Sequence, residues 1–170
     1  MENIFRFSQE SPFHLSVGAV LYNEEGLIAT HYFQEFHLRG EAKYENIFLL
    51  MRETVESGES LEVAVERGLR EEIGAEGKIE QFLGTIVSYF EKNGIEERIE
   101  KTTVYFLVKL SSLDLTRRLE DYEVLHSELE WHTPDSLIEK MTEQGKRYST
   151  DRNDINEEAI VKRAKRYIKT

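Results

Sequence analysis

The chain of 170 residues contains no cysteine, and this absence excludes disulfide bonds and thiolate metal sites. Proline occurs only at Pro12 and Pro134, and neither position marks a domain boundary. No stretch is long and apolar enough to cross a membrane, and residues 1–15 contain no signal-peptide core. We therefore expect a single domain over residues 1–170, in the cytoplasm and without a membrane partner.

Positive charge is also scarce. The chain has 22 lysines and arginines against 33 aspartates and glutamates, and its formal net charge is -11. This balance disfavours nucleic acid as a partner, because binding a polyanion requires a broad basic surface. It suits a protein that gathers divalent cations. Hydrophobic residues make up 39% of the chain and charged residues 32%, which indicates a globular domain with a highly charged surface.

Apolar runs separated by turn residues predict strands before and after one central helix. The expected strands cover residues 13–22, 27–33, 47–51, 78–91, 98–110 and 129–131. Asn93-Gly94 predicts a hairpin between the fourth and fifth of these strands. Residues 34–46 and 111–127 lack a clear period, and we expect them to be irregular.

Two further helices are expected near the end of the chain. Thr133 and Pro134 are suited to begin a helix that runs to about Met141. Asn153 or Asp154 would cap a final helix that ends near residue 168. Strands around a central helix, with helices late in the chain, predict a mixed sheet that is covered on both faces.

The central stretch, residues 57–75, is typical of a turn, a helix and a stop. Gly58 permits a tight turn, and Ser60 is a candidate N-cap before a run of helix formers. Gly74 suits the position after the last turn, where a positive φ is required. Apolar residues recur every four positions and form one stripe: Leu61, Val65, Leu69 and Ile73.

This stretch resembles the Nudix box, the signature G-x5-E-x7-R-E-U-x-E-E-x-G-U of Nudix hydrolases, in which U is aliphatic. Seven residues fall at signature positions: Glu59, Arg67, Leu69, Glu71, Glu72, Gly74 and Ala75. Two positions differ. Glu53 stands where the signature opens with glycine, and Gly68 stands where a glutamate follows the arginine. In that family the glutamate is usually a metal ligand and sometimes the general base.

The resemblance implies an α/β fold, an α/β/α sandwich with a mixed β-sheet. It also implies hydrolysis of a diphosphate linkage in a small-molecule nucleoside diphosphate derivative, with Mg²⁺ or Mn²⁺ as cofactor. Glu71 and Glu72 would be metal ligands, Arg67 would orient a carboxylate, and Glu59 would support the site from behind. Hard divalent cations prefer such carboxylate oxygens. Dimers are common among proteins of this resemblance, so a homodimer is a further expectation.

The two departures from the signature suggest a compensated exchange. Position 53 gains a carboxylate while position 68 loses one, at a cost of about 1 kcal/mol for glycine inside a helix. In this hypothesis Glu53 takes the place of the missing glutamate as a catalytic, metal-binding residue. Two alternatives stay open. Gly68 can simply allow close helix–sheet packing beside a surface Glu53, or the domain can bind a nucleotide-like ligand without turnover.

Outside the box, single residues are candidates for substrate contacts. The basic candidates for phosphates are Arg39, Lys43, Arg52 and Lys101. Tyr44 or Phe36 could stack on a base, although packing is their more common role. Candidates for a further ligand or base are Glu96, Glu97, Glu100, Asp121 and Glu123. The five histidines show no zinc-ligand spacing, so we assign them no metal role: His14, His31, His37, His126 and His132.

Overall fold

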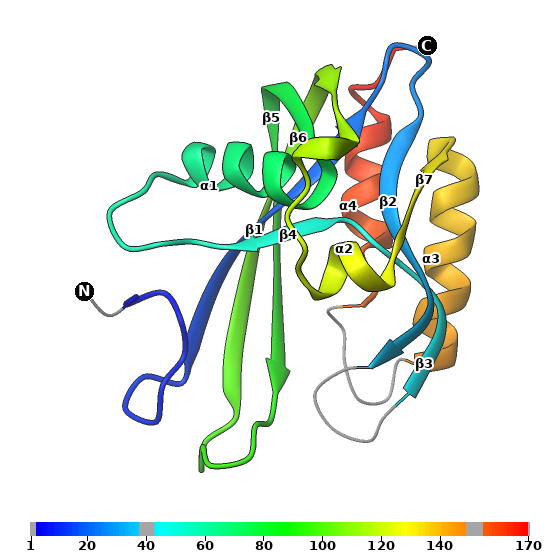
Figure 1. Cartoon of the computed structure of the whole chain (residues 1–170). Coiled ribbons are helices and arrows are strands. Elements are labelled where there is room, and N and C mark those ends of the chain that lie inside the picture. The colour runs from blue at the N-terminus through cyan, green and yellow to red at the C-terminus, as the bar shows by residue number, and fades with distance from the viewer. Residues whose placement is uncertain (1–2, 38–42, 149–154, 170) are drawn as a thin grey trace.

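A seven-stranded mixed sheet forms the centre of the molecule in the computed structural model, which describes residues 3–37, 43–148 and 155–169 (Figure 1). The strands are β1 (Phe13–Tyr22), β2 (Ile28–His37), β3 (Lys43–Leu49), β4 (Met51–Thr54), β5 (Ala75–Phe90), β6 (Ile99–Leu113) and β7 (Glu128–His132). The main order is β3-β2-β1-β6-β5, with β4 added to β1 and β7 added to β2. β1 and β6 run parallel, and the other pairs are antiparallel.

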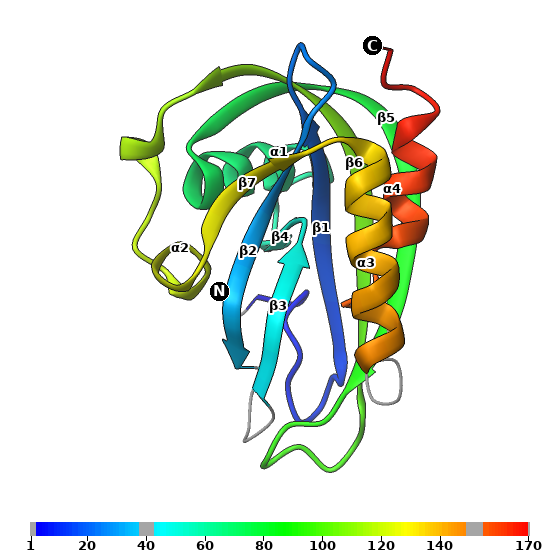
Figure 2. The ribbon, with the colours of Figure 1, turned by 90° about the vertical axis from the view of Figure 1, so that its right-hand side faces the viewer.

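Helices cover both faces of this sheet. They are α1 (Leu61–Gly68) with its π-helical continuation η1 (Leu69–Ile73), the 3₁₀ turn η2 (Leu115–Arg117), α2 (Tyr122–His126), α3 (Pro134–Tyr148) and α4 (Glu158–Lys165). Figures 1 and 2 show α3 and α4 side by side on one face, with α1 on the other. None of the helices in the described ranges is long and apolar enough to span a membrane.

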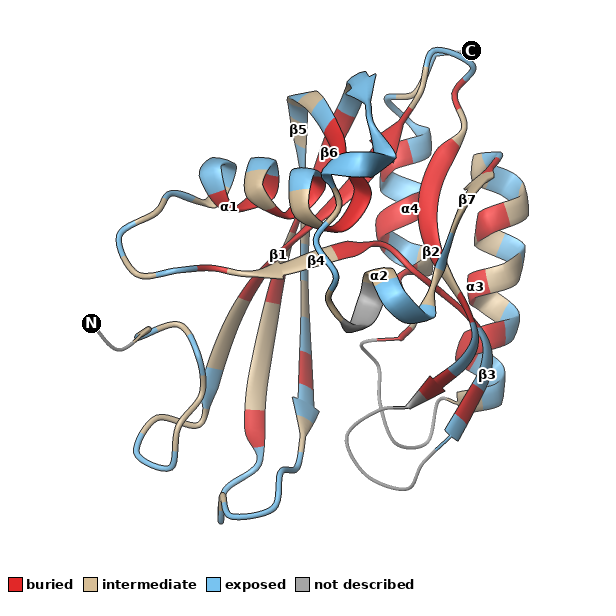
Figure 3. Ribbon diagram, viewed as in Figure 1, coloured by how far each residue is buried: buried red, intermediate tan, exposed pale blue. Residues whose placement is uncertain are grey.

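Two hydrophobic cores lie on the two faces of the sheet, and Figure 3 shows their buried residues along the inner surfaces. The first packs the sheet against α1 and η1 through Val17, Ala19, Met51, Val65, Leu69 and Ile73, among others. The second packs it against α3 and α4 through Val20, Tyr105, Leu137, Met141, Ile160 and Val161, among others. This arrangement confirms the predicted α/β/α sandwich with a mixed sheet.

The central helix begins and ends where its sequence predicts. The Ser60 hydroxyl accepts a hydrogen bond from the backbone N–H of Val63 at 3.3 Å. Gly74 has a φ of 76°, the left-handed conformation that favours glycine at a helix end. The apolar stripe is buried from Val65 onward. The last turn widens to a π-helix, which the four-residue period does not predict.

The prediction of an irregular segment over residues 34–46 is wrong where the structure describes it. β2 continues to His37 and β3 begins at Lys43. Phe33, Phe36, Tyr44, Ile47, Leu49 and Ile155 form a third buried cluster at this end of the sheet. The cross-strand ion pair between Lys43 and Glu35, 2.7 Å apart, lies on the exposed side. Long-range packing has therefore decided the local structure here.

The later segments also contain more structure than predicted. Two acidic N-caps start short helices within residues 111–127, Asp114 for η2 and Asp121 for α2. α3 continues past Met141 to Tyr148, and buried Gln144 in its last turns hydrogen-bonds the backbone of Phe48. The predicted caps of the final helix, residues 153 and 154, lie outside the described residues, and α4 ends at Lys165.

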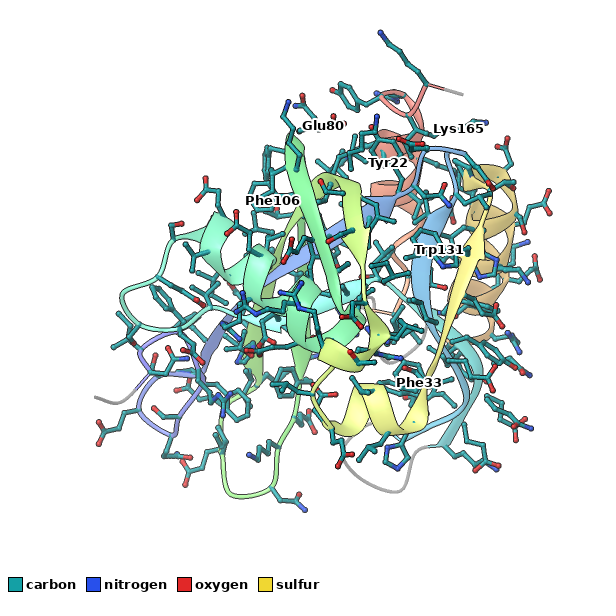
Figure 4. The ribbon with its side chains drawn as sticks, turned by 45° about the horizontal axis from the view of Figure 1, so that its top comes forward. Tyr22, Phe33, Glu80, Phe106, Trp131 and Lys165 are labelled. Atoms are coloured by element: carbon teal, nitrogen blue, oxygen red, sulfur yellow. The ribbon has the colours of Figure 1, made fainter. Side chains whose placement is uncertain are left out.

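A hydrogen bond between a buried tyrosine and an exposed glutamate fastens β5 to β1 across the intervening β6. The Tyr22 hydroxyl donates to Oε2 of Glu80 at 2.7 Å, and Figure 4 shows the two side chains near the end of the sheet. Burial and this carboxylate raise the pKa of Tyr22 to about 12. The phenol is therefore neutral, and a donor, at any physiological pH.

Candidate active site

A cavity of about 350 Å³ lies between β4, strands β1 and β6, and the end of the box helix, which is formed by α1 with η1. Its acidic lining side chains are Glu53, Glu72 and Asp121, and its basic ones are Arg6, Arg52, Lys92 and Lys101. Polar residues of β1 and β4 complete the wall, among them Ser16 and Thr54. The cavity therefore combines carboxylates that suit a divalent cation with cations that suit an anionic ligand.

Arg67, in the last turn of α1, holds the acidic residues beside this cavity together. Its Nη2 donates to Oε1 of Glu59 at 2.8 Å and its Nε donates to Oε2 at 3.3 Å, a two-point pairing. The same Nη2 donates to the carbonyl of Thr54 at 2.7 Å. Nη1 lies 3.3 Å from Oε1 of Glu53 and 3.5 Å from Oε2 of Glu71. Arg67 thus joins the helix to β4 and to the loop that follows it.

The pKa values of these groups follow from their surroundings. The hydrogen bond from Arg67 lowers the pKa of Glu59 below its ordinary value of 4.5. Burial raises the pKa of Glu53, and the charge of Arg67 offsets only part of that rise. Burial alone would lower the pKa of Arg67, but hydrogen bonding to Glu59 and the charges of both glutamates outweigh it. Burial therefore disfavours the ionised form of Glu53.

Glu53 and Gly68 lie directly against each other. A Cβ added at Gly68 would be 2.7 Å from the Cβ of Glu53 and 2.7 Å from Sδ of Met51. Real Cβ atoms essentially never approach so closely, so a side chain at position 68 requires its neighbours to move. The two departures from the box signature therefore lie in contact with each other. The helix can approach β4 this closely only because position 68 has no side chain.

Glu72 is the most buried carboxylate of the box, and its orientation is held by the sheet. Only 4% of the residue is exposed. Nε2 of His31, on β2, lies 3.0 Å from its Oε2, and Nδ1 of the same ring lies 2.9 Å from Oγ of Ser127. A buried carboxylate needs such partners, because its desolvation would otherwise be costly. The chain from Ser127 through His31 therefore fixes one oxygen of Glu72, a residue that also lines the cavity.

The π-helical turn that carries Glu71 and Glu72 is supported by the segment after β6. The backbone N–H of Leu119 donates to the carbonyl of Glu71 at 2.7 Å. Nε of Arg118 donates to the carbonyl of Glu72, also at 2.7 Å. The last carbonyls of a helix have no partner within it, so these two bonds satisfy groups that would otherwise be unpaired. Burial lowers the pKa of Arg118.

The donor set fits a hard divalent cation that keeps some of its water. Across residues 3–37, 43–148 and 155–169, no three His, Asp or Glu side chains form a ready-made cation cage. Mg²⁺ does not require one, since it is commonly held by one or two carboxylates together with substrate phosphates and water. Glu53 and Glu72 supply two carboxylates to one cavity. Glu71 lies beside them but is directed toward Arg67 and does not line that cavity.

The structure brings some of the predicted substrate residues to the cavity and leaves others away from it. Arg52 and Lys101 line it. Tyr44 and Phe36, 8% and 6% exposed, are buried in the third core cluster, where Tyr44 packs edge-on against the ring of Tyr148. Lys43 pairs with Glu35 and Glu45 on the strand surface. Arg39 lies outside the described residues.

Among the additional carboxylates, Asp121 alone of the described candidates reaches the cavity. It also caps α2, since it accepts a hydrogen bond from the N–H of Val124 at 2.9 Å. Glu100 accepts from the hydroxyl of Tyr89 at 3.2 Å and lines a separate pocket. Glu96 and Glu97 are exposed in the turn between β5 and β6. The side chain of Glu123 is not described.

Residues of this site that sequence reasoning missed include His31, Ser127, Arg6 and Lys92. The spacing of His31 matches no zinc motif, and its side chain has a carboxylate partner, Glu72, at 3.0 Å. The alternation of β2 places it on a buried face, and a buried histidine signals a polar partner. Arg6 and Lys92 lie in irregular segments, and no local pattern selects them.

Comparisons with known proteins agree with this geometry. A family model described as NUDIX domain matches residues 12–152. A NUDIX hydrolase from Nitrosomonas europaea has a similar structure, with a TM-score of 0.60 and 19% identity, covering 91% of this chain and 90% of that one. The MutT protein from Methanosarcina mazei Go1 has a TM-score of 0.55 and 20% identity, covering 96% and 100%. Among curated proteins, none matches this chain.

A third similar structure is the MutT NUDIX hydrolase from Burkholderia pseudomallei. Its TM-score is 0.52 at 20% identity, covering 72% of this chain and 84% of that one. At such identities the likeness concerns the fold.

Replacing Glu59 by glutamine should reduce stability in a pH-dependent way. The folded-state pKa of Glu59 is lowered, so its pairing with Arg67 stabilises the fold above pH 4.5 and is lost as the pH falls through the folded-state value. We expect Glu59→Gln to lower the free energy of unfolding by about 1–3 kcal/mol at pH 7. Urea titrations at pH 7 and pH 3 measure this difference.

The matched control is Glu66→Gln, an exposed glutamate on the same helix. It should leave the free energy of unfolding within about 0.5 kcal/mol of the wild-type value at both pH values. An equal deficit of Glu59→Gln at both pH values would show that its charge is not what stabilises the loop.

Proposed function

Because the chain belongs to the Nudix family, we propose that it is a divalent-metal-dependent hydrolase that cleaves a diphosphate linkage in a nucleoside diphosphate derivative. Nudix hydrolases act on small-molecule, nucleotide-type substrates, and the chain has their fold. The observation that carries the proposal is the contact of Glu53 with Gly68. It brings the Cβ of Glu53, on β4, against the one box position that lacks a carboxylate, and the Glu53 side chain lines a cavity together with Glu72.

Glu72 and Glu53 would hold Mg²⁺ or Mn²⁺ in this proposal, and Glu71, which shares Arg67 with Glu53, would take part if it left Arg67. The bound cation would neutralise charge on the phosphoryl oxygens and lower the pKa of an attacking water. The chain's own residues orient the carboxylates. His31 holds Glu72, while Arg67 and the backbone N–H of Thr54, which donates at 2.7 Å, hold Glu53. Water would add to a phosphorus atom as the bridging P–O bond breaks.

A second candidate function is ligand binding without turnover. The observation that favours it is the pairing of both Glu53 and Glu71 with Arg67, which keeps these carboxylates occupied. A domain of this kind would bind a nucleotide-like ligand through the same cavity. Turnover separates the two functions, because only the hydrolase would release product.

Removing the charge of Glu72 or Glu53 should abolish hydrolysis. Product release would be measured from nucleoside triphosphates, nucleotide sugars and dinucleotides with Mg²⁺ or Mn²⁺. We expect Glu72→Gln and Glu53→Gln each to lose about two to three orders of magnitude in kcat, because each removes a charged oxygen donor. Glu66→Gln is the surface control.

Near-normal turnover of Glu53→Gln would contradict the compensated exchange while leaving the hydrolase intact. Silence of the wild type across the panel, together with a metal-dependent rise in Tm, would favour the binding domain instead.

Exchanging the two positions tests the steric argument directly. Gly68→Glu alone should destabilise the protein and inactivate it, because its Cβ meets that of Glu53. The double variant Glu53→Gly/Gly68→Glu removes the contact with the Glu53 Cβ, and the close atoms that remain, Sδ and Cε of Met51, belong to the end of a flexible side chain. We expect it to regain both Tm and measurable hydrolysis relative to Gly68→Glu, a strongly non-additive result. A double variant that folds but stays as inactive as Glu53→Gly would refute the exchange.

His31 should act as a positioning residue for Glu72. We expect His31→Ala to lower kcat by about 10- to 100-fold and to raise the Mn²⁺ concentration needed for half-maximal rate, since partners of metal-bound groups contribute on this scale. The KM for substrate should change little. His31→Gln keeps a hydrogen-bond donor and should recover part of the loss. An unchanged Mn²⁺ requirement in a folded His31→Ala protein would remove this role.

A further inference from the structure

Four basic side chains converge on the cavity from four different segments of a strongly acidic chain. Arg6 comes from the segment before β1, Arg52 from β4, Lys92 from the turn after β5, and Lys101 from β6. Three carboxylates line the same cavity. A bound divalent cation would therefore leave the lining with an excess of positive charge, on a protein whose net charge is -11. Such a local excess focuses attraction on an anion.

The segment that carries Arg6 is fastened to the loop that follows Glu53. The side-chain amide of Asn3 donates to the carbonyl of Val55 at 2.9 Å, and the N–H of Ile4 donates to Oγ of Ser57 at 3.0 Å. The N–H of Leu15 donates to the carbonyl of Phe5, also at 2.9 Å. These bonds fix the backbone that carries Arg6 relative to the loop after Glu53, and the Arg6 side chain lines the cavity.

Lys92 is positioned by an aromatic contact. Its Nζ lies 4.8 Å from the ring centroid of Phe7, which packs edge-on against Phe90 at 5.4 Å and at a tilt against His14 at 5.5 Å. Arg52 and Lys101 make contacts within the protein. By contrast, no carboxylate in the described part of the chain pairs with Arg6 or Lys92. These two cations are therefore available to a ligand.

The same cavity offers little aromatic surface for a base. Phe7 and His14 are its aromatic side chains among the described residues, and their rings lie at a tilt 5.5 Å apart. The Phe7 ring also contacts Lys92 and Phe90, so a base that stacked on the Lys92 side of this ring would displace that lysine. The other lining side chains are charged or hydroxylic, which suits phosphate oxygens better than a heterocycle.

We propose that this cavity selects its substrate by the length and charge of the phosphate chain, three phosphates or more, and not by the base. The proposal rests on the proposed function and narrows its substrate class. Two phosphates would lie at the carboxylate side of the cavity, and the phosphates beyond them would meet Arg6 and Lys92. Lysine and arginine both bind phosphate strongly, and arginine can do so through two parallel bonds.

Binding tests this selection whether or not the protein turns substrate over. Titration calorimetry with Mg²⁺ would compare tripolyphosphate with pyrophosphate at low ionic strength. We expect tripolyphosphate to bind at least about tenfold more tightly, and the preference to shrink as salt is added. Arg6→Ala and Lys92→Ala should each remove most of it, while Arg6→Lys should keep it. Lys78→Ala, an exposed lysine on β5 away from the cavity, is the control.

Steady-state kinetics tests whether the base contributes to substrate selection. The wild-type kcat/KM should vary less than about threefold among ATP, GTP and UTP, since stacking supplies little of the recognition. Equal affinity for tripolyphosphate and pyrophosphate, or a strong preference among bases, would overturn the inference. Hydrolysis of two-phosphate substrates would still support the proposed function in that case. If the protein bound tripolyphosphate selectively but hydrolysed none of the substrates, the inference about the cavity would stand and the proposed hydrolase function would be refuted.

Discussion

The close approach of β4 to the box helix is the constraint on which the site depends. At Gly68 the helix lies so close to the Cβ of Glu53 and the sulfur of Met51 that a side chain at position 68 would require both residues to move. Arg67 holds this approach from the adjacent turn by bonding Thr54 and Glu59. The Glu53 side chain therefore starts from a packing contact at its Cβ, while Arg67 and the N–H of Thr54 hold its carboxylate, so a change at position 53 or 68 acts on the other.

Electrostatics gives the cavity two kinds of lining. Its carboxylates Glu53 and Glu72 are oriented by Arg67 and His31, at a desolvation cost that the raised pKa of Glu53 reflects. Its cations include Arg6, whose segment is fastened by backbone hydrogen bonds, and Lys92, which contacts an aromatic ring. Buried polar networks stabilise a site only when each member has a partner. The Ser127–His31–Glu72 chain meets that condition.

Local sequence patterns predicted the central helix correctly. The four-residue stripe, the Ser60 cap and Gly74 defined the central helix, because each reports a contact within a few residues. The described parts of residues 34–46 form strands that no local period predicts, because Phe36 and Tyr44 are buried in a cluster with Ile155, far along the chain. The π-helical turn was missed for a similar reason, since its carbonyls are satisfied by Arg118 and Leu119.

By itself, the sequence determined the family resemblance, the central helix with its two ends, and the two unusual box positions, 53 and 68, because these follow from the spacing of residues along the chain. Only the tertiary structure decided which side chains surround Glu72, which basic residues share its cavity, and that Tyr44 is buried elsewhere. The physical reason is distance along the chain. His31, Ser127, Arg6 and Lys92 approach the box only through sheet pairing and loop anchoring, and no local period encodes such contacts.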